Sequence, residues 1–426
     1  MRLPGAKAVV AGSSLLVLLA ASLTLRHWAR VEVAPEAADL PPSGWWRLAL
    51  EDVARGPSRE ELARQLSLPY AAGSLPPEPG RTGVVAIDPV QALPGYRLYV
   101  SGHGPEALLI DREGKVLHRW RLPFRRAFPE RPETRETAFF RRARLEPDGT
   151  LLALYQGGGL VRLDPASRPL WRLAVNAFND FWVSPDGEEL LYLDKQTRNL
   201  SGETFLEDFV VALDPHGREQ WRFSLLQALE QSSFRELLEP PGPSADRLHS
   251  NKIARLTAPE VIGSPFREGD LLVSLREIDT VLVLDGLAHT VLWGRRGPYS
   301  RQHAPVLFPG GRLLLFDNRG FGSHRSRILE VEIASQRVRH VWPPEGVRFF
   351  SAQAGDLHPL PNGHLLVVES ERGRAYELNR NLEIVWEFRS PHRAGTRAEY
   401  VASLFDLVYV ETNHPGLQAL KLRQAP

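Results

Sequence analysis

A short pattern of polar and apolar residues recurs along most of the chain. A tight turn rich in Pro, Asp, Asn or Gly is followed by three to five apolar residues, and the clearest examples begin at Pro147, Pro185, Glu268, Pro309 and Pro361. Short apolar runs bounded by turn residues are typical of β-strands. The repeats also share a Trp: Trp120, Trp171, Trp221, Trp293, Trp342 and Trp386.

The spacing of these Trp residues indicates the fold. Successive intervals are 51, 50, 72, 49 and 44 residues, and a repeat of this length that holds four short strands is typical of a β-propeller blade. We therefore predict an all-β fold, a six-bladed β-propeller over residues 84–390, in which the Trp residues pack between blades. Residues 391–426 are predicted as a C-terminal extension. A two-sheet sandwich is the alternative, and it does not explain the Trp period.

The N-terminus has a different pattern. Arg2 and Lys7 precede an uncharged run from Ala8 to Leu25, and 18 residues of helix span roughly 27 Å, close to the thickness of a bilayer core. This predicts a signal-anchor transmembrane segment over residues 1–30. A signal peptide cleaved near Ala20-Ala21-Ser22 is the alternative.

Residues 31–83 are predicted as a stem with a short helix that begins at a capping box at Ser58. No other stretch is apolar enough over a sufficient length to span a membrane. The anchor therefore predicts that the propeller lies on the outer side of the membrane, periplasmic or extracellular.

Composition excludes several classes of function. The 426 residues carry a formal net charge of +1, which argues against a nucleic-acid partner. The chain has no Cys, and this excludes disulfides, thiol nucleophiles, Cys-ligated zinc and iron–sulfur clusters. Neither a Gly-x-x-x-x-Gly-Lys phosphate loop nor a His-x-His or His-Glu-x-x-His spacing occurs. We therefore predict no cofactor and no metal.

Alignment of the repeats on their turns brings together residues that suit an anion. His249 and His303 fall at matching starts of inner strands in adjacent blades, and Arg319 returns to the same rim after the second strand of the fifth repeat. Arg276 has the matching place in the fourth repeat. An arginine offers a fixed fork of donors, and a histidine exchanges protons near neutrality. Polar neighbours complete the predicted binding site: Asn251, Gln302 and Asn318.

These residues also have a simpler interpretation. A histidine at the start of a strand is commonly a structural residue with its hydrogen bonds satisfied, and Arg319 next to Asp317-Asn318 could stabilise its own loop. His358 lies three residues beyond the position that matches His303 in the sixth repeat. The two-residue period of a strand then directs its side chain to the other face of the sheet.

Six stretches resemble the bacterial arylsulfate sulfotransferases and their arylsulfotransferase-like relatives. They are Val84–Tyr96, Leu109–Trp120, Asp246–Asn251, Arg301–His303, Leu313–Gly320 and Leu360–Gly363. The resemblance covers residues 84–390. It implies a six-bladed propeller, acting outside the membrane, that moves a sulfuryl group from an aryl sulfate to a phenolic acceptor through a sulfated histidine, without a nucleotide sulfate donor.

The resemblance also implies roles for individual residues. His249 and His303 would lie beside the sulfuryl group, and Arg319 would neutralise its oxygens. The family's enzymes use a further histidine as nucleophile, and His358 is the candidate downstream of Arg319; otherwise His303 would take this role. Two alternatives to this enzyme are a non-catalytic membrane-anchored propeller that binds an anionic ligand or a protein partner, and a quinone-cofactor dehydrogenase propeller.

Overall fold

A computed structural model describes residues 71–200, 203–239, 245–320 and 325–422. The predicted anchor at residues 1–30 and the stem helix at Ser58 lie outside this part of the chain. Within the described ranges, no helix is both long and apolar enough to cross a membrane. All described residues belong to one compact unit, Ser43–Pro426.

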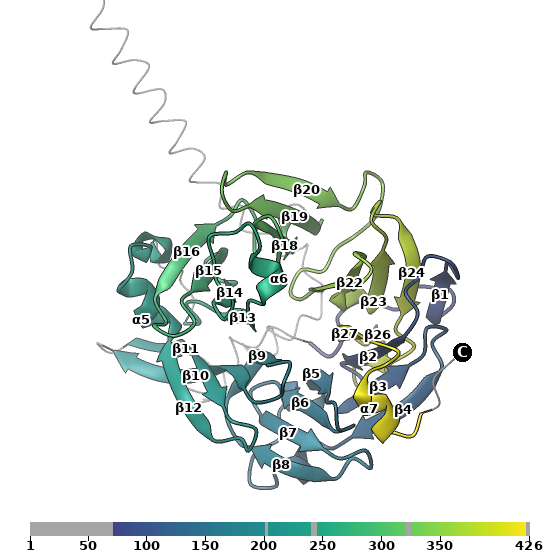
Figure 1. The fold of residues 1–426 in the computed structure, drawn as a ribbon. Helices are drawn as coiled ribbons and strands as arrows, with labels where there is room; N and C mark the ends of the chain where they lie inside the picture. Colours follow the sequence, from purple (N-terminus) through teal and green to yellow (C-terminus); the bar gives the residue numbers. More distant parts are fainter. Residues whose placement is uncertain (1–70, 201–202, 240–244, 321–324, 423–426) are drawn as a thin grey trace, which may run out of the picture. The chain divides into compact units, whose positions relative to one another are not determined.

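The structure contains six antiparallel sheets of four or five strands, called blades 1 to 6 here (Figure 1). Blade 1 consists, from its innermost strand outward, of β27 (Leu404–Val410), β2 (Tyr96–Ser101), β3 (Glu106–Ile110) and β4 (Val116–Arg121). Blade 2 consists of β5 (Phe140–Leu145), β6 (Leu151–Tyr155), β7 (Gly159–Leu163) and β8 (Pro169–Leu173). Blade 3 consists of β9 (Ala177–Val183), β10 (Leu190–Leu200), β11 (Glu203–Leu213) and β12 (Glu219–Ser224).

The second half of the chain forms the other three blades. Blade 4 consists of β13 (Ser250–Arg255), β14 (Leu271–Leu275), β15 (Thr280–Leu284) and β16 (Val291–Arg296). Blade 5 consists of β17 (His303–Phe308), β18 (Arg312–Asp317), β19 (Arg327–Glu332) and β20 (Val338–Trp342). Blade 6 consists of β21 (Asp356–Pro359), β22 (Leu365–Glu369), β23 (Arg374–Leu378), β24 (Ile384–Arg389) and, as a fifth strand, β1 (Gly83–Ile87).

Short helices lie between the strands and after the last one. They are α4 (Phe124–Ala127), α5 (Leu225–Glu230), α6 (Ala258–Val261) and α7 (Pro415–Ala419), with 3-10 turns η1 (Glu136–Ala138), η2 (Arg235–Leu238) and η4 (Ser370–Arg372). A separate two-stranded ribbon pairs β25 (Arg393–Ala394) with β26 (Tyr400–Val401). Helix α5 and η2 fill the long third interval of the repeat, between blades 3 and 4.

The innermost strands contact one another in a closed cycle. Strands β5, β9, β13, β17, β21 and β27 each contact the next, and β27 contacts β5. The prediction of an all-β, six-bladed propeller is therefore confirmed. The transmembrane part of that prediction concerns residues that the structure does not describe.

The ring extends past the predicted end of the propeller at residue 390. Strand β27, within the segment predicted as an extension, pairs with β2 from Tyr96↔Val410 onward. The innermost strand of blade 1 thus comes from the C-terminal end of the chain, and the other three from the first part of the propeller. The repeat pattern did not reveal β27 because this strand enters the ring without the turn, second strand and Trp that mark the other repeats.

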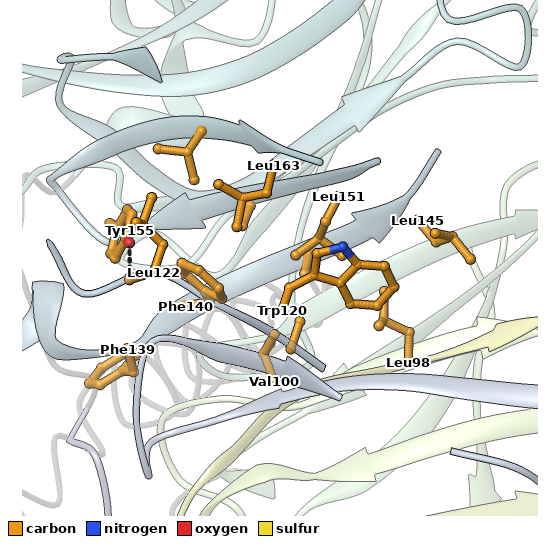
Figure 2. Close-up of a cluster of buried hydrophobic side chains, with 14 of the residues drawn as sticks. Leu98, Val100, Trp120, Leu122, Phe139, Phe140, Leu145, Leu151, Tyr155 and Leu163 are labelled. Atoms are coloured by element: carbon orange, nitrogen blue, oxygen red, sulfur yellow. Dashed lines mark hydrogen bonds between the residues drawn. The ribbon is translucent and has the colours of Figure 1, made fainter. Parts of the chain in front are cut away.

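The repeated Trp residues occupy the fourth strand of every blade. Each lies in, or packs against, an apolar cluster that joins its own blade to the next one around the ring. Figure 2 shows Trp120 between Leu98 of blade 1 and Leu145 and Leu151 of blade 2. The prediction that these residues pack between blades is confirmed. The Trp residues recur at a regular interval because each blade uses one of them to pack against the next.

Candidate functional site

Two buried histidines lie where the inner strands of adjacent blades begin. His249 directly precedes β13, with a left-handed backbone angle φ of 49°, and His303 is the first residue of β17. Both side chains are almost completely buried. The Asn251 side-chain amide donates to the backbone carbonyl of Gln302 at 2.8 Å, and this hydrogen bond ties the two strand starts together.

A carboxylate orients His249. Nδ1 of His249 lies 2.5 Å from Oδ2 of Asp246, and both oxygens of Asp246 accept from Nζ of Lys195, at 2.7 and 2.6 Å. Burial and the nearby charges of Arg276 and Lys195 hold the pKa of His249 well below its usual range. The neutral ring must then carry its proton on Nδ1, since the partner there accepts. Nε2 is left with the lone pair.

His303 is held in the same tautomer by a neutral partner. Its Nδ1 lies 2.8 Å from Oδ1 of Asn318 and 3.0 Å from the Arg301 carbonyl. The amide nitrogen of Asn318 donates to the carbonyls of Ser351 and Ala354, which fixes the direction of Oδ1. Burial and the charge of Arg276 lower the pKa of His303 to about 3. Both Nδ1 partners are acceptors, so Nε2 of His303 also carries a lone pair.

Arginines surround this pair of imidazoles. Arg276 follows β14, is buried, and lowers the pKa of both histidines, so its charge lies close to each ring. Glu277 accepts from Arg276 at 2.6 Å and from Arg301 at 2.7 Å. Burial opposes ionisation of Glu277, but these two arginines outweigh it and lower the pKa of Glu277 to about 2. The carboxylate therefore stays charged and balances part of the positive charge.

Arg319 is positioned differently from Arg276. It follows β18, and burial together with the charges of Arg301 and Arg276 lowers its pKa. Its Nε is buried and has no hydrogen-bond partner among the described residues. A guanidinium that is desolvated without a bound carboxylate is suited to an anionic ligand. The structure therefore brings Arg319, Arg276, His249 and His303 into one charged group.

The three amides predicted as ligand-binding groups bond to the protein itself. Asn251 and Asn318 fix the two strand starts and the ring of His303, as described above. The Gln302 amide donates to the carbonyls of Thr280 and Leu275 at 2.9 and 3.2 Å, which joins β17 to blade 4. In the described contacts, the three amides hold the segments that carry the histidines. The sequence pattern could not distinguish this structural role from contact with a ligand.

Sequence reasoning missed Asp246, Glu277, Lys195 and Arg141. Asp246 had a signal, because it stands three residues before His249 in the same short motif. Arg141 lies at the repeat position that matches His303 and lowers the pKa of that histidine. Lys195 had no signal, since it reaches Asp246 from 51 residues away in the chain.

His358 belongs to a different group of charges. Its Nε2 lies 3.0 Å from Oδ1 of Asp406 and 3.7 Å from Oδ1 of Asp356, on inner strands β27 and β21. Arg142 of β5 forms ion pairs with both carboxylates and, at 3.3 Å, with Asp180. Another cation, Lys252, lies 3.5 Å from Asp180. We call Arg142, Asp180, Lys252, Asp356 and Asp406 the inner charge cluster.

This cluster concerns the predicted place of His358 and the prediction of no metal site. The contacts given for His358 are with Asp406 and Asp356. Ligand atoms of Asp356, His358 and Asp406 lie within 4.8 Å of one another, a spacing that a metal ion can use. The Arg142 guanidinium already contacts both carboxylates, so a cation there would have to compete with a fixed positive charge.

The fold and the site define a class of protein: a six-bladed propeller with neutral imidazoles at the starts of its inner strands and arginines beside them. The sequence profile of the arylsulfotransferase (ASST) family matches residues 158–391, more than half of the chain. The chain belongs to this family. No curated protein matches it in sequence.

Similar solved structures are distant in sequence. A protein of unknown function from Bacteroides caccae is 16% identical with a TM-score of 0.44, and the match covers 70% of this chain and 94% of that one. A streptogramin B lyase is 9% identical with a TM-score of 0.44, covering 78% and 98%. The hydrazine synthase of Kuenenia stuttgartiensis is 12% identical with a TM-score of 0.42, covering 65% and 71%.

Proposed function

We propose that this protein transfers a sulfuryl group from an aryl sulfate donor to a phenolic acceptor through a covalent intermediate on His303. The observation that carries the proposal is the tautomer of the two histidines. Acceptors at Nδ1 and lowered pKa values leave Nε2 of both rings with a lone pair, beside arginines that suit an anion. Membership of the arylsulfotransferase family supports the same chemistry.

The first step forms a bond between Nε2 of His303 and the sulfur of the donor. The bond from sulfur to the aryl oxygen breaks, and its electron pair leaves with the aryl oxygen as a phenolate. In the second step Nε2 of His249 removes the proton of the acceptor phenol, whose oxygen attacks the sulfur. The nitrogen–sulfur bond breaks and its electron pair returns to His303. The proton on His249 then passes to water.

The two histidines are assigned by their Nδ1 partners. Asp246 is a carboxylate and stabilises an imidazolium, which favours His249 as the group that gains and loses a proton. Asn318 is neutral, and the pKa of His303 is about 3. A weakly basic imidazole is a good leaving group once it carries the sulfuryl group. Arg319 and Arg276 supply positive charge for the sulfuryl oxygens.

The test uses p-nitrophenyl sulfate with phenol as acceptor and follows release of nitrophenolate. We expect release by the wild type, loss of release in His303→Ala, and near wild-type release in His358→Ala, a matched histidine that contacts the inner charge cluster. Mass spectrometry of a donor-treated sample should find one added SO3 group on the peptide with His303. Loss of release in His358→Ala with retention in His303→Ala would contradict the assignment. Binding of aryl sulfates without turnover under any acceptor would favour the non-catalytic alternative.

The cellular location is part of the proposal. The apolar run before residue 26 is expected to anchor the chain, with the propeller outside the membrane. Fractionation of cells that produce the full chain tests this: the protein should remain with membranes after a high-salt wash and be accessible to protease added outside that membrane.

A further inference from the structure

We propose that Lys195 is a positioning residue of this site: it holds Asp246 in place and keeps His249 neutral until the acceptor proton is transferred. The proposal rests on the proposed function for its catalytic meaning. Its structural part concerns the state of His249 and can be measured separately.

The geometry shows a chain of buried charges that ends at His249. Lys195 lies on β10, in blade 3, and is buried. Two of its three ammonium donors reach the two oxygens of Asp246, and the Asp246 Oδ2 that accepts one of them also contacts Nδ1 of His249. Asp208 lies 3.8 Å from Nζ and accepts from both the backbone and the hydroxyl of Ser250.

A lysine fits this position better than an arginine does. Its ammonium is a compact charge with three donors in a tetrahedral arrangement, whereas a guanidinium is a wide planar fork. The ring of Phe178 lies 5.2 Å from Nζ and limits the space around it. In a chain with 52 basic residues, nearly all of them Arg, a lysine bound to both oxygens of one carboxylate indicates a requirement for that shape.

The charge of Lys195 changes what Asp246 does to His249. A carboxylate alone would stabilise the imidazolium and so favour protonation. Lys195 offsets that charge, and Arg276 and His303 add to its effect, while Glu277 acts in the opposite direction. These groups come from blades 3, 4 and 5. Together with burial, which is the largest cause of the lowered pKa of His249, they leave a ring that keeps its orientation from Asp246 but does not hold a second proton.

The experiment measures His249 directly. The full chain is labelled selectively at histidine ring nitrogens, and the His249 signals are assigned by their loss in His249→Gln. In the wild type, His249 should remain neutral at pH values where an exposed histidine binds a second proton, with its one proton on Nδ1. In Lys195→Met, the titration midpoint of His249 should move upward, because Asp246 then acts on the ring without its counter-charge. Lys195→Arg retains the charge and should stay closer to the wild type.

Lys252→Met is the matched control. It also removes a lysine that faces an aspartate, but this lysine belongs to the inner charge cluster and not to the group around His249. It should leave the His249 titration unchanged. In transfer assays, Lys195→Met should lower kcat with little change in KM and shift the pH profile upward, and a purely structural role would not move that profile. Lys195→Gln, which keeps a hydrogen-bond donor without the charge, repeats the test if the Met variant does not fold.

The outcomes separate this proposal from the proposed function. A wild-type His249 that titrates like an exposed histidine would overturn the role of Lys195, and so would folded Lys195 variants with an unchanged His249 midpoint. Failure of both neutral variants to fold would count against it too, because Lys195 would then be required for folding. If no aryl sulfate is turned over but the midpoint moves as expected, the proposed function fails and the coupling from Lys195 to His249 stands.

Discussion

Replacing Arg142 with Met should destabilise the propeller strongly at neutral pH and much less at low pH. Arg142 is buried on β5 and forms ion pairs with Asp180, Asp356 and Asp406. Removing one partner of a buried ion pair costs about 3–5 kcal/mol, because the remaining charge loses its compensation. Lys252 still faces Asp180, so we expect a value near the lower end, which for a propeller of this size lowers Tm by roughly 4 °C.

The pH dependence follows from the carboxylates. Burial opposes ionisation of Asp356 and Asp406, but Arg142 outweighs it and holds their pKa values below those of an exposed Asp. In the wild type this contribution to stability is complete above the unfolded-state pKa of about 4 and is lost as the pH falls through the lower folded-state values. Without Arg142, burial alone should raise both pKa values. The penalty is then full at neutral pH and is relieved as the carboxylates bind protons.

The assay is thermal unfolding followed by Trp fluorescence, for wild type and variant, from about pH 7.5 to about pH 4.5. The Tm difference between the two proteins should become smaller as the pH falls. Arg144→Met is the control: Arg144 lies two residues further along β5, is more exposed, and has one weak ion pair at 3.4 Å with Glu146. A decrease in Tm no larger than that of Arg144→Met would refute this reasoning. So would a Tm difference between wild type and variant that grows toward low pH.

Three further predictions concern the fold and the rim of the ring. Trp342→Ala should lower the free energy of unfolding by about 3–5 kcal/mol, since this side chain is buried between blades, and Trp171→Ala, which is partly exposed, by clearly less in the same denaturant titration. Leu407→Asp places a charge at a fully buried position of the closing strand, so we expect no folded, monodisperse protein by circular dichroism and size-exclusion chromatography. Gly102→Ala would bring a Cβ atom to 1.9 Å from the carbonyl oxygen of Ala72, so limited proteolysis of the segment before β1 should be faster while Tm changes little.

The sequence was sufficient to predict the ring because each blade repeats the same requirement. A turn, a run of apolar residues and an inter-blade Trp must recur whenever a blade packs against the next, and Trp120 and Trp386 show that this holds at both ends of the repeat. Strand β27 escaped prediction for the complementary reason. It is a single strand that completes a blade whose other strands are far away in the chain, so no local period marks it.

The site was predictable in position and much less so in contacts. The innermost strands have similar lengths, so residues at the same distance before the turn that ends each strand lie at the same rim of the propeller. This placed His249 and His303 at one rim. Alternation along a strand also separated His358 from them. The direction of an amide and the partner of a carboxylate depend on neighbouring blades, which a single sequence does not show. Asn318 therefore turned out to orient His303, and Lys195 was not anticipated.

The balance of charge explains how the two histidines can be neutral and still serve the proposed reaction. Arg276, Arg301 and Arg319 act on this region against Glu277 and Glu371, so positive charge is in excess among these five groups. Burial and the charge of Arg276 lower the pKa of His249 and His303, and the positive charge also favours entry of an anion. In the proposed reaction, a bound sulfate ester cancels part of the excess, which raises the proton affinity of His249 only once donor and acceptor are in place. Arg276 thus helps to keep the nucleophile neutral before binding, and the bound anion allows the base to act after it.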